Sequence, residues 1–423
     1  MKSTVCDRRS LILAAACLAT PLLVSAPAAL VSGAPATETA SPACAAGQPV
    51  DSRPPSLGGA RRKSALALDW LGRIARDPSV HTGFSPFGIS QVLTALEIGA
   101  DPAMKAAIAN ALKFSRRQRG AALQGLRADA RLLATIAGRP TAPFASADGL
   151  FIDQALKLAP GVEDLVQSEA GIAMRKVDFA KSEAIEEINR WAKERTAGRI
   201  DSILEPGSNP SLVALNAFAF KDCWRIPFDP AQTSDAPFTR LDGSVITVRT
   251  MALQNETLAH GQSGGFVGLE LPYADDRFVM TLVTTAGAPA PPADFGRARD
   301  LLAGIGLKPG AVRLTLPKFD GDAEHDLLPL LAAGGLAPGL ASKTQLSGFA
   351  DGLTLSAVKQ KIYIRADEKG TEAAAATAAI ATRSAIQASP TPISFDKPFV
   401  YALRHRATGT MLMVGYVGKP GSK

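Results

Sequence analysis

The sequence predicts an α+β fold built as one large domain. Apolar residues recur at helical spacing in residues 66–74 and 89–96, whereas residues 213–221, 278–283 and 312–319 are strand-like apolar runs. Of the 423 residues, 46% are hydrophobic and 20% are charged, so the chain can bury a sizeable core and is not broadly disordered. No internal repeat or linker requires a second domain.

Residues 1–36 have the pattern of an export signal. Lys2, Arg8 and Arg9 form a basic region, an apolar run follows at 11–24, and the segment ends in small residues that suit a cleavage site. We therefore expect this signal peptide to be removed and the mature protein to be exported, either extracellular or periplasmic.

The export route is not decided by this segment. Arg8 and Arg9, followed by Ser10 and Leu11, resemble the twin-arginine export motif of bacteria, but a paired arginine also occurs in signals of the Sec route. Cys17 lies in a weak match to a lipoprotein signal. Both routes, and lipidation, remain open.

Residues 37–60 are rich in Ala, Pro, Ser, Thr and Gly and predict a flexible tail ahead of a folded part, 61–423. Two cysteines remain after removal of the signal, Cys44 in the tail and Cys223. Export permits disulfides, but two cysteines far apart in the sequence do not establish one. We expect no structural disulfide between them.

The folded part opens with two predicted helices. Leu66, Trp70 and Ile74 recur at helical spacing and predict the buried face of the first helix. Ser85 is placed to cap the second helix, and Pro86 suits its first position because proline lacks the backbone N–H that would be unpaired there.

The densest basic region of the chain lies between residues 113 and 119. It contains Lys113, Arg116, Arg117 and Arg119. A solvated helix face is one interpretation, and a weak binding site for a polyanion is the other. A specific nucleic-acid partner is not expected, because only 6% of the residues are aromatic and they are not interleaved with the basic ones.

The sequence lacks the patterns that catalytic chemistry requires. No two of the four histidines have the helical spacing of metal ligands, and Cys-x-x-Cys, Gly-x-Ser-x-Gly and the phosphate-binding glycine patterns are missing. We therefore expect no catalytic residue, no metal and no cofactor. A secreted enzyme of unrelated chemistry is an alternative that no motif supports.

The apolar run 213–221 is too short to cross a membrane and is typical of a buried strand. Its one polar residue before the final lysine is Asn216, whose amide needs hydrogen-bond partners if it is buried. Trp224 follows and, taken alone, indicates a core aromatic residue.

Residues 367–388 join a charged, glycine-containing turn to a run of small residues at 373–381. Alanine is the best helix former, so an exposed helix or a linker is one interpretation. Side chains alternate along a strand, so Thr371, Ala373 and Ala375 could instead enter a core together. Such a segment could lie outside the fold in one state and become a strand in another.

Residues 368–377 resemble the hinge of the reactive-centre loop of inhibitory serpins, and residues 355–361, 396–399 and 412–415 resemble other serpin segments in the family's order. The resemblance covers roughly 61–420. It implies the serpin fold: a single large domain with a five-stranded central β-sheet A, two further sheets, about eight or nine helices and an exposed reactive-centre loop. Together with the export signal, it indicates an exported bacterial serpin of the inhibitory type, expected to be monomeric.

The resemblance also assigns roles to residues of this chain. The reactive-centre loop would span about 368–392. Its hinge would comprise Glu368, Gly370, Thr371, Glu372, Ala373, Ala374, Ala375 and Ala376. The family's shutter and breach regions would comprise Ser85, Asn216, Trp224 and Gln360, with Asn216 facing Gln360. Gly88 stands where the family has a serine, which removes one hydroxyl from this buried cluster.

A serpin of this type is a suicide-substrate inhibitor of serine proteases, with cysteine proteases as a further class. The target protease attacks the loop and forms an acyl-enzyme, and the cut loop then inserts into sheet A as a strand and traps the protease. A non-inhibitory serpin that acts as a protease substrate, a carrier or a chaperone is the alternative.

Two bonds of the loop are candidates for attack. Arg383 is the only charged side chain between Glu372 and Asp396, and it suits a trypsin-like pocket, which favours the bond to Ser384. The usual loop length of the family instead gives the bond between Ser384 and Ala385, which suits an elastase- or subtilisin-like protease. A solvated loop arginine is the third interpretation of Arg383.

Overall fold

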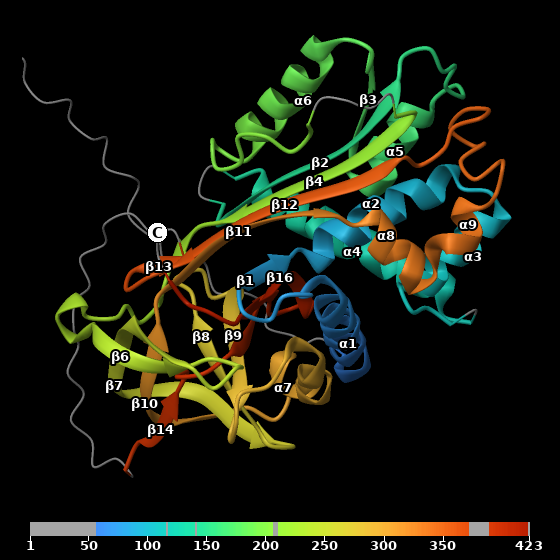
Figure 1. The fold of residues 1–423 in the computed structure, drawn as a ribbon. Coiled ribbons are helices and arrows are strands. Elements are labelled where there is room, and N and C mark those ends of the chain that lie inside the picture. Colours follow the sequence, from blue (N-terminus) through green and yellow to red (C-terminus); the bar gives the residue numbers. More distant parts are fainter. Residues whose placement is uncertain (1–55, 116, 140–141, 206–209, 372–388, 422–423) are drawn as a thin grey trace, which may run out of the picture. The chain divides into compact units, whose positions relative to one another are not determined.

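A seven-stranded sheet and a nine-stranded sheet, both with helices packed on them, form the part of the chain that the computed structural model describes (Figure 1). That part comprises residues 56–115, 117–139, 142–205, 210–371 and 389–421. These residues fall within one compact unit, so the predicted α+β fold in a single large domain is confirmed.

The seven-stranded sheet has the strand order β3-β2-β4-β12-β13-β5, and β11 pairs with the other edge of β12. Its strands are β2 (Phe144–Asp153), β3 (Ala173–Val177), β4 (Leu212–Phe220), β5 (Asp222–Cys223), β11 (Phe319–Asp326), β12 (Ala357–Ala366) and β13 (Gly370–Thr371). We expected five strands in this sheet, and five of its strands, β2, β3, β4, β11 and β12, have five or more residues. The other two, β5 and β13, have two residues each and extend the pairing at one end of the sheet.

The nine-stranded sheet has the order β1-β16-β15-β9-β8-β7-β10-β14, with β6 also paired to β7. Its strands are β1 (His81–Phe84), β6 (Ser234–Thr239), β7 (Val245–Ser263), β8 (Phe266–Pro272), β9 (Phe278–Thr285), β10 (Lys308–Pro317), β14 (Thr391–Ser394), β15 (Phe399–His405) and β16 (Thr410–Val417). We expected two separate sheets here. The 19-residue strand β7 joins them, because different parts of it pair with β6, β8 and β10.

The α-helices are α1 (Leu57–Ile74), α2 (Pro86–Gly99), α3 (Pro102–Ala111), α4 (Arg119–Ala137), α5 (Val162–Ala170), α6 (Ser182–Arg195), α7 (Arg299–Leu302), α8 (Leu328–Leu331) and α9 (Ala337–Leu340). Short 3-10 segments are η1 (Pro230–Gln232) and η2 (Pro292–Ala298), and η3 (Ala332–Leu336) is a π-helical turn. Helix α2 packs on β2 and β4 from one face of the seven-stranded sheet, and Figure 1 shows α6 on the opposite face.

Local sequence signals set the starts of the first two helices. The Ser85 hydroxyl accepts the Gly88 N–H, so Ser85 caps α2 and Pro86 occupies its first turn, as expected. Helix α1 begins at Leu57, earlier than Arg61, because the Ser56 hydroxyl accepts the Gly59 N–H and caps it.

Strand β4 is buried at all nine positions, which confirms the prediction of a buried strand. Its side chains alternate between two cores. Val213, Leu215 and Ala217 face the cluster that includes α6, whereas Ala214 and Phe218 face the clusters on the α2 side. Asn216 therefore lies on the α2 face of the sheet.

Cys223, in β5, is disulfide-bonded. Our expectation concerned a bond between Cys223 and Cys44; Cys44 lies outside the described residues, so that expectation stays a prediction. A single sequence does not show which segments the fold brings against Cys223. Within the described part of the chain, none of the helices is both long and apolar enough to cross a membrane.

Candidate functional site

Strand β13 lies at the end of the contact between β4 and β12. Residues 213–219 of β4 pair in parallel with residues 357–363 of β12, and we call this pairing the seam. Beyond it, Thr371 of β13 pairs with Ala366 of β12 on one side and with Asp222 of β5 on the other. Since β5 follows β4 directly, β13 already separates the two chain segments at this end.

Thr371 is fully buried at this position, and its hydroxyl hydrogen-bonds the Tyr273 hydroxyl at 2.7 Å. Gly370 beside it has no room for a side chain, since an added Cβ would lie 2.1 Å from the Asp222 carbonyl oxygen. The β13 backbone can therefore approach β5 this closely only with glycine at 370.

Trp224 covers the turn that leads into β13. Its indole N–H donates to the Asp367 carbonyl at 2.8 Å, and its backbone N–H donates to the Lys369 carbonyl at 2.9 Å. The indole also stacks on Tyr273, with ring centroids 4.6 Å apart. Trp224 is thus a core aromatic residue that also holds the turn.

Glu368 anchors the same turn by its side chain. Its carboxylate accepts hydrogen bonds from Lys318 at 3.0 and 3.2 Å and from the Thr233 hydroxyl at 2.9 Å. Burial alone would raise the pKa of Glu368, but the bonds from Lys318 and Thr233 outweigh it and lower the pKa below its ordinary value.

Asp222 brings a second carboxylate to the end of the seam beside β13, which we call the hinge end. Burial raises the pKa of Asp222 to about 7, although the N–H groups of Cys223 and Asp275 donate to its oxygens. Nothing in the sequence singled out this residue, because only its pairing with Thr371 places it beside the hinge.

Farther along the seam, a buried polar cluster ties α2 to both strands. The Gln360 side chain accepts the Ser85 N–H at 2.8 Å and donates to the Ser85 carbonyl at 3.0 Å and to Asn216 Oδ1 at 2.7 Å. Asn216 in turn donates to Asp148 Oδ1 at 2.5 Å. We call Ser85, Gln360, Asn216 and Asp148 the latch.

Asp148 is the latch residue that sequence reasoning missed. Burial raises its pKa to about 6, against the bonds that it accepts from Ser146 and Asn216. Gly88 completes the cluster by leaving space, since a Cβ there would lie 2.1 Å from Asn216 Oδ1. The space left by the missing serine side chain is thus occupied by the asparagine amide.

The latch belongs to a polar row that crosses four strands. In register, Asp148 lies opposite Asn216, Asn216 opposite Gln360, and Gln360 opposite His325 of β11. His325 contacts the Gly83 carbonyl at 2.8 Å, and burial lowers the pKa of this histidine. The four residues lie at one level across the sheet.

The structure thus brings Glu368, Gly370, Thr371 and Trp224 together at one end of the seam and Ser85, Asn216 and Gln360 together in its middle. The remaining predicted site residues lie outside the described residues: Glu372, Ala373, Ala374, Ala375, Ala376, Arg383, Ser384 and Ala385. The described part of the chain resumes at residue 389 and forms β14, which pairs with β10 at the edge of the nine-stranded sheet.

The basic region is the connection between α3 and α4 and the start of α4, not one continuous helix face. Arg119 pairs with Glu97 at 3.2 Å, and Lys113 lies 3.8 Å from Asp69. Arg117 has no ion pair with the described residues, and Arg116 lies outside them. Among the described residues, no group of three or more His, Cys, Asp or Glu side chains could hold a metal.

Known proteins share both the sequence pattern and the fold. The family model "Serpin (serine protease inhibitor)" matches residues 61–420. Plasminogen activator inhibitor 1 of Bos taurus is 30% identical over 353 residues, which cover 80% of this chain and 86% of the relative. The structure of native protease nexin-1 with heparin superposes with a TM-score of 0.72 at 24% identity, covering 86% of this chain and 100% of the other. Thyroxine-binding globulin with thyroxine gives a TM-score of 0.70 at 23% identity, with coverage of 86% and 99%.

Proposed function

The chain belongs to the serpin family over residues 61–420, and from this premise we propose that it is a suicide-substrate inhibitor of serine proteases. In this proposal, the target protease attacks the reactive-centre loop, which joins β13 to β14. Cleavage there would release the segment after Thr371, which would insert into the seam as a strand.

The position of β13 carries this proposal. At the hinge end, β13 is antiparallel to both β12 and β5, whereas β12 and β4 are parallel to each other along the seam. A strand that continues β13 into the seam would replace one parallel ladder by two antiparallel ones, and antiparallel pairing is slightly more stable per residue. Strand addition of this kind is a known mode of peptide recognition.

The residues that would follow Thr371 suit such an insertion. Alanine occupies 373–376, and small side chains enter a packed sheet without overpacking it. We propose the bond between Arg383 and Ser384 as the reactive bond, because a trypsin-like pocket carries a buried aspartate that binds arginine. Attack between Ser384 and Ala385 by a protease with a small pocket is the alternative.

Mixing the full chain with trypsin, and separately with elastase, tests the proposal on a denaturing gel. A covalent complex that survives boiling in detergent is expected with trypsin. Cleavage of the loop without a complex would contradict the inhibitory mechanism and would instead indicate a protease substrate, carrier or chaperone. Mass spectrometry of the released C-terminal fragment identifies the bond, since the fragment begins at Ser384 or at Ala385.

We further propose that the protein is exported and that residues 1–36 are its signal peptide, on the strength of their basic and apolar pattern. N-terminal sequencing of secreted material tests this, and an intact Met1 would contradict it. Weak polyanion binding at Arg117 and its neighbours is supported by the basic composition and by the likeness to the nexin bound to heparin.

A further inference from the structure

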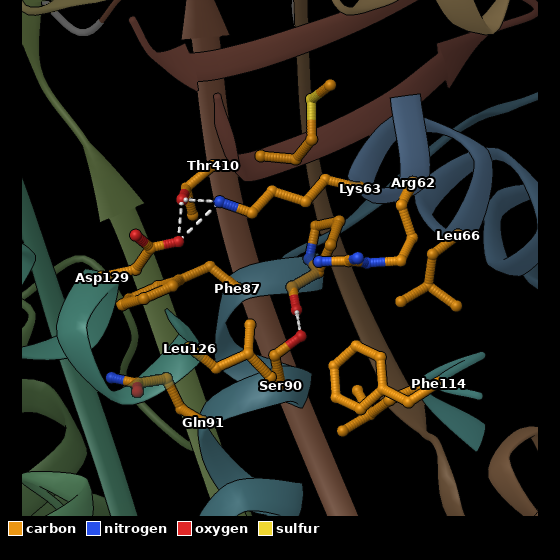
Figure 2. A pocket seen from close by; sticks show the side chains of 13 residues that line it. Arg62, Lys63, Leu66, Phe87, Ser90, Gln91, Phe114, Leu126, Asp129 and Thr410 are labelled. Carbon is orange, nitrogen blue, oxygen red and sulfur yellow. Dashed lines mark hydrogen bonds and ion pairs between the residues drawn. The ribbon is translucent and has the colours of Figure 1, made fainter. Parts of the chain in front are cut away.

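A hollow beside α1 is lined mostly by carbon atoms and lies apart from the seam and the hinge. Its walls come from α1, α2, α4, β16 and the residues after α3 (Figure 2). The apolar lining consists of Leu66, Phe87, Leu112, Phe114, Leu126 and Met411. Its cavity volume is ≈ 50 Å³, several times the ~10–15 Å³ that one water molecule needs.

The polar groups on one wall are already satisfied. Lys63 donates to the Asp129 carboxylate at 2.6 Å, to the Thr408 carbonyl at 2.8 Å and to the Thr410 hydroxyl at 3.0 Å. These three bonds use all donors of the ammonium group and neutralise Asp129. Figure 2 shows the Lys63 ammonium pointing toward Asp129 and Thr410, so these charges are already paired with each other.

Arg62 is different, because its guanidinium has no acidic partner among the described residues. It is half-buried and lies over the Phe114 ring, 5.4 Å from the ring centroid. Stacking on an aromatic face leaves the N–H groups at the edge of the guanidinium plane for an acceptor. The hollow thus combines an apolar lining with one cation, Arg62, that has no acidic partner in the part of the chain that the structure describes.

We infer that this hollow binds a small amphipathic carboxylate, with its alkyl chain among Leu66, Leu126 and Met411 and its carboxylate on Arg62. Arginine presents paired N–H groups that match a carboxylate. A single available cation favours a monoanion. A polyanion has no apolar part to place in the hollow, so this site is distinct from any polyanion site on the basic region.

Ligand binding in the hollow would also stabilise the latch, because the two share helix α2. Pro86, Phe87 and Ser90 line the hollow, and they directly follow Ser85, whose backbone holds Gln360. A ligand that binds the native arrangement stabilises it by mass action. The melting temperature should therefore rise with ligand concentration.

Isothermal titration of the full chain with octanoate tests the inference, with octylamine as the probe of opposite charge. We expect saturable binding of one octanoate and at least tenfold weaker binding of octylamine. Arg62→Gln should weaken octanoate binding about tenfold, the effect of losing one charge-assisted contact. Arg61→Gln is the matched control, since Arg61 lies next to it on α1 but pairs with Asp300 at 2.9 Å; it should leave binding unchanged.

A second variant tests the apolar part independently. Leu66→Trp places a larger side chain in the hollow at a half-buried position and should abolish octanoate binding with an unchanged melting temperature of the free protein. The inference is overturned if octanoate does not bind saturably, if Arg62→Gln binds it as tightly as the parent chain, or if Arg61→Gln weakens it equally.

Discussion

The hinge end of the seam and its middle are both polar, yet different chemistry holds them. At the hinge end, the ion pair of Glu368 with Lys318 and the backbone bonds to Trp224 fix a turn, and β13 already separates the flanking strands. In the middle, β4 and β12 are in direct contact, and neutral amides of Asn216 and Gln360 join them. In the proposed mechanism, the inserting strand would enter at the hinge end, and the middle of the seam would have to open for insertion to continue.

The carboxylates of Glu368 and Asp148 differ in the same way. Glu368 has a cationic partner and a lowered pKa, so its charge stabilises the hinge end at neutral pH. Asp148 has only a hydroxyl and an amide as donors, and burial raises its pKa. Its ionisation therefore opposes the native packing of the latch, so Glu368 and Asp148 should contribute to stability with opposite pH dependence. Asp222 at the hinge end, whose pKa burial raises to about 7, should follow the trend of Asp148.

The largest effect is expected from Thr371→Arg at the hinge end. Thr371 is fully buried, and an unpaired buried charge costs several kcal/mol. Loop cleavage should continue while covalent complexes with trypsin disappear. Thr371→Ser keeps the hydroxyl and is the control, for which complex formation should persist. An unchanged yield of complexes from Thr371→Arg would show that insertion of the chain at Thr371 is not required for trapping the protease.

In the middle of the seam, Gln360→Ala should lower the stability of the native state by roughly 2–4 kcal/mol. It leaves Asn216 Oδ1 and the Ser85 N–H without partners, and each buried unsatisfied group costs about 1–3 kcal/mol. The Ser85 carbonyl keeps its bond from the Ile89 N–H. Thermal unfolding measures the loss. Lys359→Ala, one residue away in a part-exposed ion pair with Asp326, should cost less than about 1 kcal/mol. Equal effects of the two variants would mean that the latch does not hold the seam.

Asp148→Asn should stabilise the native state at high pH. The folded pKa of about 6 lies above the ordinary 3.8, so the bound proton stabilises the fold fully below pH 3.8, and this contribution is lost as pH rises through 6. The free energy of unfolding of the variant should exceed that of the parent by on the order of 1–3 kcal/mol at pH 8 and should equal it below pH 4. A variant that is less stable at both pH values would refute this assignment.

The smallest effect is expected from Glu368→Gln, with the opposite pH trend. The lowered pKa of Glu368 means that its contribution is present above pH 4.5 and is lost as pH falls. The variant should lose about 1 kcal/mol at pH 7 and progressively less in acid. Glu324→Gln removes a more exposed pair with Lys361 and should cost less still. A loss that is constant from pH 7 to pH 3 would show that the carboxylate charge is not involved.

Local signals in the sequence were sufficient for several elements. The cap at Ser85, the buried strand around Asn216 and the family pattern of residues 368–371 each depend on neighbours in the chain. The pairing of Asn216 with Gln360 came from the family resemblance, since 144 residues separate them.

What was missed depends on strand register and on long-range packing. Asp148 is an ordinary aspartate in the sequence until β2 aligns it with Asn216. Asp222 and Tyr273 meet Thr371 only through β5 and the end of β8. The disulfide bond of Cys223 could not be predicted for the same reason, because sequence separation says nothing of distance in the fold.

The structure of the loop-cleaved protein tests the central claim most directly. After limited proteolysis near Arg383, we expect the chain beyond Thr371 to lie between β4 and β12, antiparallel to both. The bond between Gln360 and Asn216 should then be broken. If residues 213–219 still pair with residues 357–363 in the cleaved protein, as they do in the intact chain, the seam does not accept the loop and the account is wrong.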